Sequence, residues 1–127
     1  MSAGKGAELL LTERALRDIA EIEAYSVSQW GKPVADRYVA DIEAALARLR
    51  DKPDLLRARD DLPRHLRFYQ VNKHVLVCDV RPRAVCVLTV IHGSRDIPSR
   101  LSELQPTLAA EVKLLHAGLG RGRIGKK

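Results

Sequence analysis

Two apolar runs in the second half of the chain most constrain how it can fold. Val75 to Val80 and Ala84 to Ile91 contain a single charged residue between them, Asp79. Short runs of this kind, rich in Val, are typical of strands that are buried on both faces. A sheet built on two such strands needs a covering layer on each side. The rest of the chain, or a partner, must supply both layers.

A third strand and two turns complete an antiparallel meander. Leu66 to Val71 has the composition of a strand, and Val71-Asn72-Lys73-His74 supplies the turn that follows it. Arg81-Pro82-Arg83 supplies the second turn, between the two apolar runs. This order predicts three antiparallel strands connected by tight turns. Glu8 to Leu11 is a candidate for an additional first strand.

Two amphipathic helices precede the meander. Apolar residues recur at helical spacing from Leu16 to Trp30 and again from Val34 to Leu49. Thr12 suits the N-cap of the first helix, Gly31 ends it, and Pro33 fits the first turn of the second helix. Because the connection is so short, the two helices should be antiparallel neighbours. This helical hairpin can cover one face of the sheet.

A third helix is predicted near the end of the chain, with Pro106 in its first turn. Its apolar side chains keep to one face: Leu101, Leu104, Leu108, Val112 and Leu115. This stripe can cover the second face of the sheet, or else it serves a protein partner; we favour the first alternative. The fold class is therefore α+β, with an N-terminal antiparallel helical hairpin packed on a twisted antiparallel β-sheet and an extra C-terminal helix.

The chain divides into four segments around one domain. A length of 127 residues fits a single domain. We expect a flexible leader at residues 1–7, the folded domain at 8–97, a helical extension at 98–118 and a basic flexible tail at 119–127. No apolar stretch approaches the roughly 20 residues that span a bilayer, and no signal peptide is evident. The sequence therefore predicts a soluble, cytoplasmic protein without a membrane partner.

Composition favours an acidic partner and gives no sign of a metal or cofactor. The formal net charge is +6, which suits nucleic acid, the ribosome or an acidic protein. Cys78 and Cys86 have no metal-ligand spacing and are more typical of small buried side chains. If Arg81-Pro82-Arg83 formed a three-residue loop, the two thiols would face each other and a disulfide would be sterically allowed. Nothing indicates an oxidising compartment, however.

Basic side chains gather around the predicted sheet. His92 and Arg95 follow its last strand, Arg67 lies at the start of its first, and Arg81 and Arg83 occupy its second turn. If the sheet forms as described, some of these residues border one side of it. Clustered Arg suits phosphate or carboxylate recognition through paired hydrogen bonds. Alternatively, arginines at turns are simply solvated, and Arg95 pairs with the aspartate beside it.

The basic set contains one candidate for acid–base catalysis. His92 could act as a general acid or base near neutral pH. Metal-free RNA cleavage also needs a second acid or base and cations for the phosphorane charge. Tyr69 is the remaining candidate for that second role. The chain is thus better equipped to bind an anionic or protein target than to cut RNA, and no residue is assigned firmly as catalytic.

The order of motifs from Leu9 to Ile97 resembles the RelE/ParE superfamily of type II toxins, and most of all its ParE-like branch. The first helix carries Leu11-Thr12, Ala15-Leu16, Asp18-Ile19, Ile22 and Tyr25, and the second carries Ala35, Tyr38, Ile42, Leu46, Leu49 and Pro53. The ending Val90-Ile91-His92-Gly93-Ser94-Arg95-Asp96-Ile97 is similar to the terminal strand and His-Gly-x-Arg-Asp tail of that branch.

The resemblance implies a growth-inhibiting toxin that a cognate antitoxin neutralises. ParE-like members poison DNA gyrase, whereas RelE-like members cut messenger RNA on the ribosome. Such nucleases usually place a catalytic Tyr or His near the end of the last strand; here His92 occupies that region, with Arg67 and Arg95 as its cationic partners. The target-binding set common to both alternatives is Arg67, Arg81, Arg83, His92 and Arg95.

Three aromatic residues are candidates for binding the antitoxin. Antitoxins are often disordered segments that fold on the toxin, and a basic toxin suits an acidic amphipathic helix. Tyr25, Trp30 and Tyr38 would anchor such a helix if they are exposed, because exposed aromatic side chains often anchor interfaces. The alternative is that all three belong to the core, and for Tyr38 we prefer that interpretation.

Overall fold

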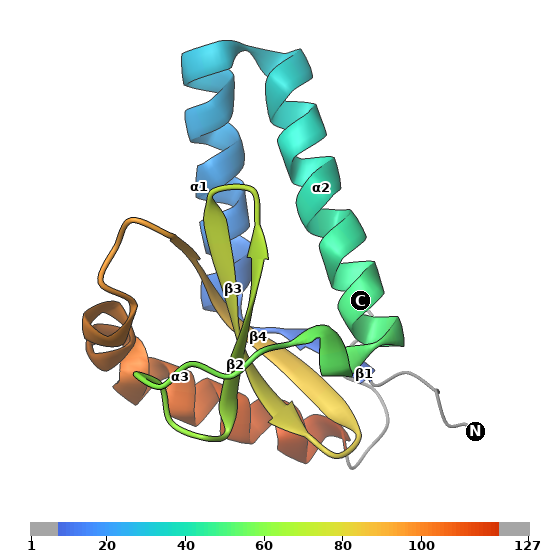
Figure 1. Cartoon of the computed structure of the whole chain (residues 1–127), viewed down its shortest axis with the longest axis vertical. Helices are drawn as coiled ribbons and strands as arrows, with labels where there is room; N and C mark the ends of the chain where they lie inside the picture. Colours follow the sequence, from blue (N-terminus) through green and yellow to red (C-terminus); the bar gives the residue numbers. More distant parts are fainter. Residues whose placement is uncertain (1–7, 120–127) are drawn as a thin grey trace.

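The computed structural model describes residues 8–119, which form three helices, one 3-10 turn and a four-stranded sheet (Figure 1). In chain order the elements are β1 (Glu8–Leu11), α1 (Glu13–Trp30), α2 (Lys32–Asp51), η1 (Pro53–Leu55), β2 (Leu66–Val71), β3 (His74–Arg81), β4 (Ala84–His92) and α3 (Ile97–Leu119). The predicted leader, residues 1–7, and residues 120–127 of the predicted tail lie outside this range. Within residues 8–119, no helix combines the length and apolarity needed to cross a membrane.

The α+β prediction is confirmed, with one addition to the sheet. The strand order is β1-β4-β3-β2, and β2, β3 and β4 form the expected antiparallel meander. The sheet is not antiparallel throughout, because β1 pairs with β4 in parallel, Leu11 opposite Val87. Between these two strands the chain passes through both hairpin helices and the meander, and a long connection of this kind is what parallel neighbours require.

Each face of the sheet is covered by helices, as the apolar runs predict. Side chains alternate along β3: Leu76 and Cys78 pack beneath the α1–α2 hairpin, whereas Val75 and Val77 face α3. The hairpin contributes Ala15, Ile42, Ala45 and Leu49 to its core, and α3 contributes Ile97, Leu101, Leu108 and Val112 to the other. In Figure 1 the hairpin rises from one side of the sheet and α3 runs across the opposite side.

The predicted helix boundaries of the hairpin are confirmed. The Thr12 hydroxyl accepts the Ala15 N–H at 3.0 Å, which caps α1, and donates to the Leu88 carbonyl at 2.7 Å. Gly31 follows α1 with a φ of 91°, a backbone conformation that favours glycine, and Pro33 lies in the first turn of α2. Thr12 therefore both begins the helix and attaches it to β4.

Two details of the prediction are wrong. Arg81 pairs with Ala84, so the second turn has two central residues and not the three that would place the thiols opposite each other. Cys78 and Cys86 instead lie in different cores, and both are free thiols. Burial raises the pKa of both thiols, that of Cys86 to about 12. The third helix also starts at Ile97, earlier than expected. Pro106 consequently lies inside α3 and not in its first turn.

The early start of α3 has a local cause. The Asp96 carboxylate accepts the Ser99 N–H at 3.2 Å, which is the geometry of an N-cap, and Pro98 then occupies the first turn. The short segment between β4 and α3 therefore acts as a helix start. As a result, α3 begins directly beside the polar end of β4.

Candidate functional site

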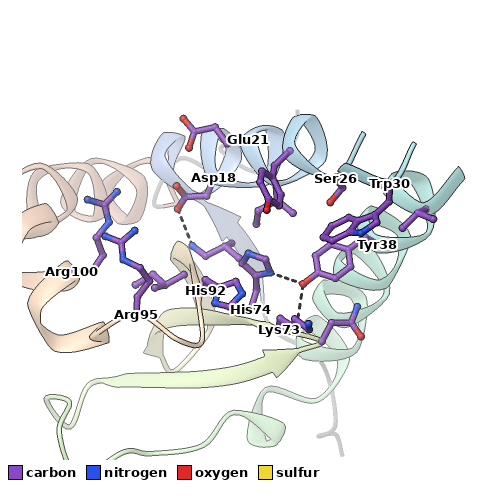
Figure 2. A pocket seen from close by; sticks show the side chains of 16 residues that line it. Asp18, Glu21, Ser26, Trp30, Tyr38, Lys73, His74, His92, Arg95 and Arg100 are labelled. Carbon is purple, nitrogen blue, oxygen red and sulfur yellow. Dashed lines mark hydrogen bonds between the residues drawn. The ribbon is translucent and has the colours of Figure 1, made fainter. Parts of the chain in front are cut away.

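A groove of about 930 Å³ lies between the helical hairpin and the paired ends of β3 and β4 (Figure 2). Its apolar wall includes Tyr25, Trp30 and Val34, and its polar floor includes His74 and His92. The groove therefore unites two sets of residues that the sequence predicts separately, the aromatic antitoxin candidates and the end of the last strand.

Asp18 fixes the position of α1 along the groove. Its carboxylate accepts the Val90 N–H at 2.9 Å and the Thr89 hydroxyl, and it pairs with Arg14 at 3.2 Å. The pairing of β1 with β4 ends at Val87, so the rest of that edge of β4 has no neighbouring strand. Asp18 supplies the missing hydrogen-bond acceptor there, and a buried donor left without one would be costly.

Tyr25 and Trp30 are both well exposed at the far end of α1. Their side chains are 59% and 60% exposed, and the two rings meet edge to face with centroids 5.9 Å apart. Val34, at the start of α2, is 41% exposed beside them. Large apolar side chains that gather in one exposed patch commonly mark an interaction site.

Tyr38 belongs to both the core and the groove. Its ring packs against the core beneath the hairpin and is half-buried, as preferred from the sequence. Its hydroxyl lines the groove, where it accepts the Lys73 N–H at 3.3 Å and meets His74 Nδ1 at 2.5 Å. Burial raises the pKa of Tyr38, so its phenol stays protonated at neutral pH.

His74 and His92 form a pair across β3 and β4. They occupy opposite positions in the strand register, and their ring centroids are 5.1 Å apart in an edge-to-face arrangement. Burial lowers the pKa of His74, and the neighbouring His92 lowers it further. At neutral pH the half-buried His74 is therefore an uncharged imidazole.

The hydrogen bonds fix which ring nitrogen of each histidine carries the proton. His92 Nδ1 accepts the Ser94 N–H at 3.1 Å and lies 2.8 Å from the Ser94 hydroxyl. Between Tyr38 and His74 the phenol O–H is a stronger donor than a neutral imidazole N–H, and the imidazole nitrogen is the stronger acceptor, so the Tyr38 O–H donates to His74 Nδ1. The neutral form of each ring consequently carries its proton on Nε2. Each Nε2–H is a hydrogen-bond donor and not a proton acceptor.

The predicted cationic residues do not form a single surface. His92 and Arg95 line the groove, together with Lys73 and Arg100. Arg81 and Arg83 lie at the other end of β4, separated from His92 by a strand that spans roughly 25 Å.

Two of the other predicted arginines, Arg81 and Arg67, have different surroundings. Arg81 pairs with the buried Asp79 at 2.7 Å and borders a second hollow, of about 560 Å³, beneath α3. Arg67 is half-buried in β2 and does not line the groove. The single cationic rim expected from the sequence is therefore divided, and only His92 and Arg95 remain together.

The described part of the chain contains no set of ligands for a metal ion. Within residues 8–119, no three His, Cys, Asp or Glu side chains are grouped so that they could hold a metal ion. The acidic residues of the groove are Asp18, whose carboxylate is already bonded, and Glu21 on the same helix. The groove is thus equipped for hydrogen bonding, apolar contact and the recognition of negative charge.

Comparison with known proteins places this geometry in a family. A model of the family described as ParE toxin of type II toxin-antitoxin system, parDE, matches residues 9–97. The chain belongs to the ParE toxin family. Toxin ParE of Escherichia coli is 29% identical over 97 residues, which cover 74% of this chain and 92% of that protein.

A solved structure shares the fold of this chain. A chain from the structure titled "Chromosomal ParDE TA system from P. aeruginosa" matches with a TM-score of 0.60 at 18% sequence identity. The match covers 68% of this chain and 95% of the other. The family model ends at residue 97, where α3 begins. The groove therefore lies mostly within the ParE domain, whereas all but the first residue of α3 lies beyond the family match.

Among the residues of this ParE-family groove that sequence reasoning missed are Asp18, Lys73, His74 and Arg100. His74 was detectable only to within one residue, because the two-residue turn between β3 and β4 places it opposite Ile91 and the bulge between Val77 and Cys78 shifts it to His92. Asp18 was not, since its polar position in α1 predicts a solvated side chain unless the exposed edge of β4 is known. Arg100 was missed because the start of α3 was predicted too late in the chain.

Proposed function

We propose that this ParE-family toxin inhibits growth by binding and poisoning DNA gyrase, and that a cognate antitoxin neutralises it by occupying the groove. The observation that carries the antitoxin site is the exposed pair of Tyr25 and Trp30 beside a polar floor. Aromatic side chains of this kind dominate the binding energy of many interfaces. Lys73, Arg95 and Arg100 add positive charge along the same groove, which suits an acidic amphipathic segment.

The ring geometry of the histidines supports inhibitory binding over RNA cleavage. A general base needs an unprotonated nitrogen facing its substrate. The hydrogen bonds at His74 and His92 leave Nε2–H donors toward the groove, and Arg67 lies apart from them. The messenger-RNA endoribonuclease alternative thus requires proton transfer by groups that the structure holds as donors. We expect either activity to take place in the cytoplasm.

Expression of the full chain tests the activity. We expect induced expression to arrest growth with filamentation, and the purified protein to inhibit supercoiling by gyrase in a defined reaction. Translation should continue until growth has already stopped, and co-expression of the antitoxin encoded beside the toxin should restore growth. Cleaved messages with unaffected supercoiling would contradict the gyrase proposal and favour the nuclease.

Matched substitutions on α1 test the antitoxin site. Trp30→Ser should weaken antitoxin binding by at least about 30-fold, because a central aromatic anchor commonly contributes 2 kcal/mol or more. The control is Leu16→Ser, since Leu16 is 55% exposed on the same helix but does not line the groove. Isothermal titration calorimetry measures both affinities. Equal losses for the two variants would place the antitoxin elsewhere.

A further inference from the structure

His74 and His92 present two hydrogen-bond donors side by side in the groove. Each ring has its Nδ1 bonded within the protein, to Tyr38 and to Ser94, so each retains only Nε2–H for a ligand. The cross-strand register holds the rings 5.1 Å apart, and Tyr38 fixes one of them from the side of α2. An acceptor with two oxygens can take one hydrogen bond from each of two neighbouring rings.

We propose that His74 and His92 form a subsite for one carboxylate of the antitoxin, with each imidazole donating its Nε2–H to that group. Arg95 and Lys73, which line the same groove, supply the opposite charge. The source of the carboxylate rests on the proposed docking of the antitoxin in the groove. The subsite itself rests only on the geometry of the two rings.

The charge around the pair favours a single negative group. The titratable and charged groups that line the groove around it are Asp18 and Glu21 of α1, Tyr38 of α2, Lys73 of the β2–β3 turn, Arg95 after β4 and Arg100 of α3. The Asp18 carboxylate is already bonded to Val90, Thr89 and Arg14. Arg100 pairs with Glu103 at 3.0 Å, so Lys73 and Arg95 remain against Glu21, an excess of positive charge that a ligand carboxylate would reduce.

The apolar wall favours a protein ligand over a nucleic acid. Tyr25, Trp30 and Val34 continue the groove away from the histidines and expose large apolar surfaces. An amphipathic segment can bury its apolar face against this wall while one acidic side chain reaches the histidine pair. A phosphate backbone offers no apolar face to bury against this wall.

The first experiment uses the full-length toxin alone and sodium acetate as the probe. The ring resonances of His74 and His92 are followed by NMR while acetate replaces chloride at constant ionic strength. We expect both to shift and the pKa of His74 to rise, because a nearby negative charge favours the protonated ring. His65, outside the groove, serves as the control. No response beyond that to chloride, or phosphate binding at least tenfold tighter than acetate, would overturn the carboxylate subsite.

The second experiment measures antitoxin affinity for substituted toxins. His92→Phe keeps an aromatic ring but removes the donor, and we expect at least tenfold weaker binding. His92→Gln retains an N–H donor and should remain within threefold of the unsubstituted chain, as should His65→Phe. Thermal melts confirm that each variant is folded. Equal affinity for the Phe and Gln variants would overturn the donor role of His92.

A double-substitution cycle then identifies the acidic partner. Each Asp or Glu of the antitoxin is replaced by its amide. One of these replacements should cause no further loss of affinity when the toxin already carries His92→Phe. Finding no such residue would overturn the assignment. If Trp30→Ser left antitoxin affinity unchanged, both the proposed docking and the source of the carboxylate would fail. If acetate gave no response while Trp30→Ser still weakened antitoxin binding, the carboxylate subsite would be rejected and the proposed docking would stand.

Discussion

Asp18 connects α1 to β4 at the point where the sheet has lost its neighbouring strand. The residue is 7% exposed and bonds two groups of β4 that have no strand partner on that side. A carboxylate in this position is retained only because hydrogen bonds and Arg14 compensate its burial. It therefore sets the distance between the α1 wall of the groove and its histidine floor.

Replacement of Asp18 should destabilise the fold markedly. Asp18→Ala leaves the Val90 N–H and the Thr89 hydroxyl buried without acceptors, and we expect a loss of about 2–4 kcal/mol in the free energy of unfolding. Asp18→Asn keeps one acceptor oxygen and should lose roughly half as much. Urea denaturation measures both. Glu21→Ala, at an exposed position one turn along the same helix, should change the value by less than about 0.5 kcal/mol; a comparable loss there would contradict this role for Asp18.

At the scale of single residues, the sequence predicted which residues lie in the site better than it predicted what those residues contact. His92 and Arg95 were found because they follow an apolar strand, where a rigid sheet holds side chains at its rim. Arg81 and Arg83 were grouped with them wrongly, because both sets end a strand and only the register shows that these ends are opposite. Contacts such as Asp18 with Val90 join residues 72 positions apart, which local patterns do not encode.

At the scale of elements, α3 carries an internal proline that weakens it. Pro106 is the tenth residue of the helix and has no N–H to donate to the Ser102 carbonyl four residues earlier. Pro106 is exposed, so no buried contact compensates the loss. The stripe of Leu101, Leu108 and Val112 nevertheless holds α3 on the sheet, because helices in proteins are stabilised mainly by the packing of their apolar face.

Removing this proline should stabilise the protein. Pro106→Ala restores a backbone hydrogen bond, and we expect the free energy of unfolding to rise by about 1–3 kcal/mol, since proline in a helix interior is about 3 kcal/mol less favourable than alanine and the more flexible unfolded chain offsets part of the gain. Amide hydrogen exchange in α3 should slow accordingly. Thr107→Ala, at the next exposed position, is the control and should have little effect. Faster exchange in Pro106→Ala would contradict this account of the helix.

The helices and strands were predictable wherever strong local signals agreed. Thr12, Gly31 and Pro33 each have a backbone reason for their position, and the hairpin boundaries followed from them. The direction of β1 was not predictable, because its parallel partner lies more than 70 residues later in the chain. The start of α3 was misplaced because Pro98 suits both a helix ending and a helix beginning, and the Asp96 cap decides between them.

At the scale of the whole molecule, the sheet is a central layer that depends on two separate covers. The α1–α2 hairpin and α3 each close one apolar core, and the ParE family match reaches only the first residue of α3. The apolar runs required both covers, and both were predicted. The groove could not be predicted in this way, because it forms where the hairpin, the β3–β4 ends and the start of α3 meet.

The α3 cover should therefore be indispensable to the fold of this chain even though it lies beyond the family match. Leu108 is 4% exposed against the sheet, and Leu108→Asp would bury an unpaired charge in that core. We expect a loss of about 3–5 kcal/mol in the free energy of unfolding, together with dye binding that reports exposed apolar surface. Ala110→Asp, at an exposed position two residues later, should melt like the unsubstituted protein. A stable, monomeric Leu108→Asp variant would show that the ParE domain closes its sheet without α3.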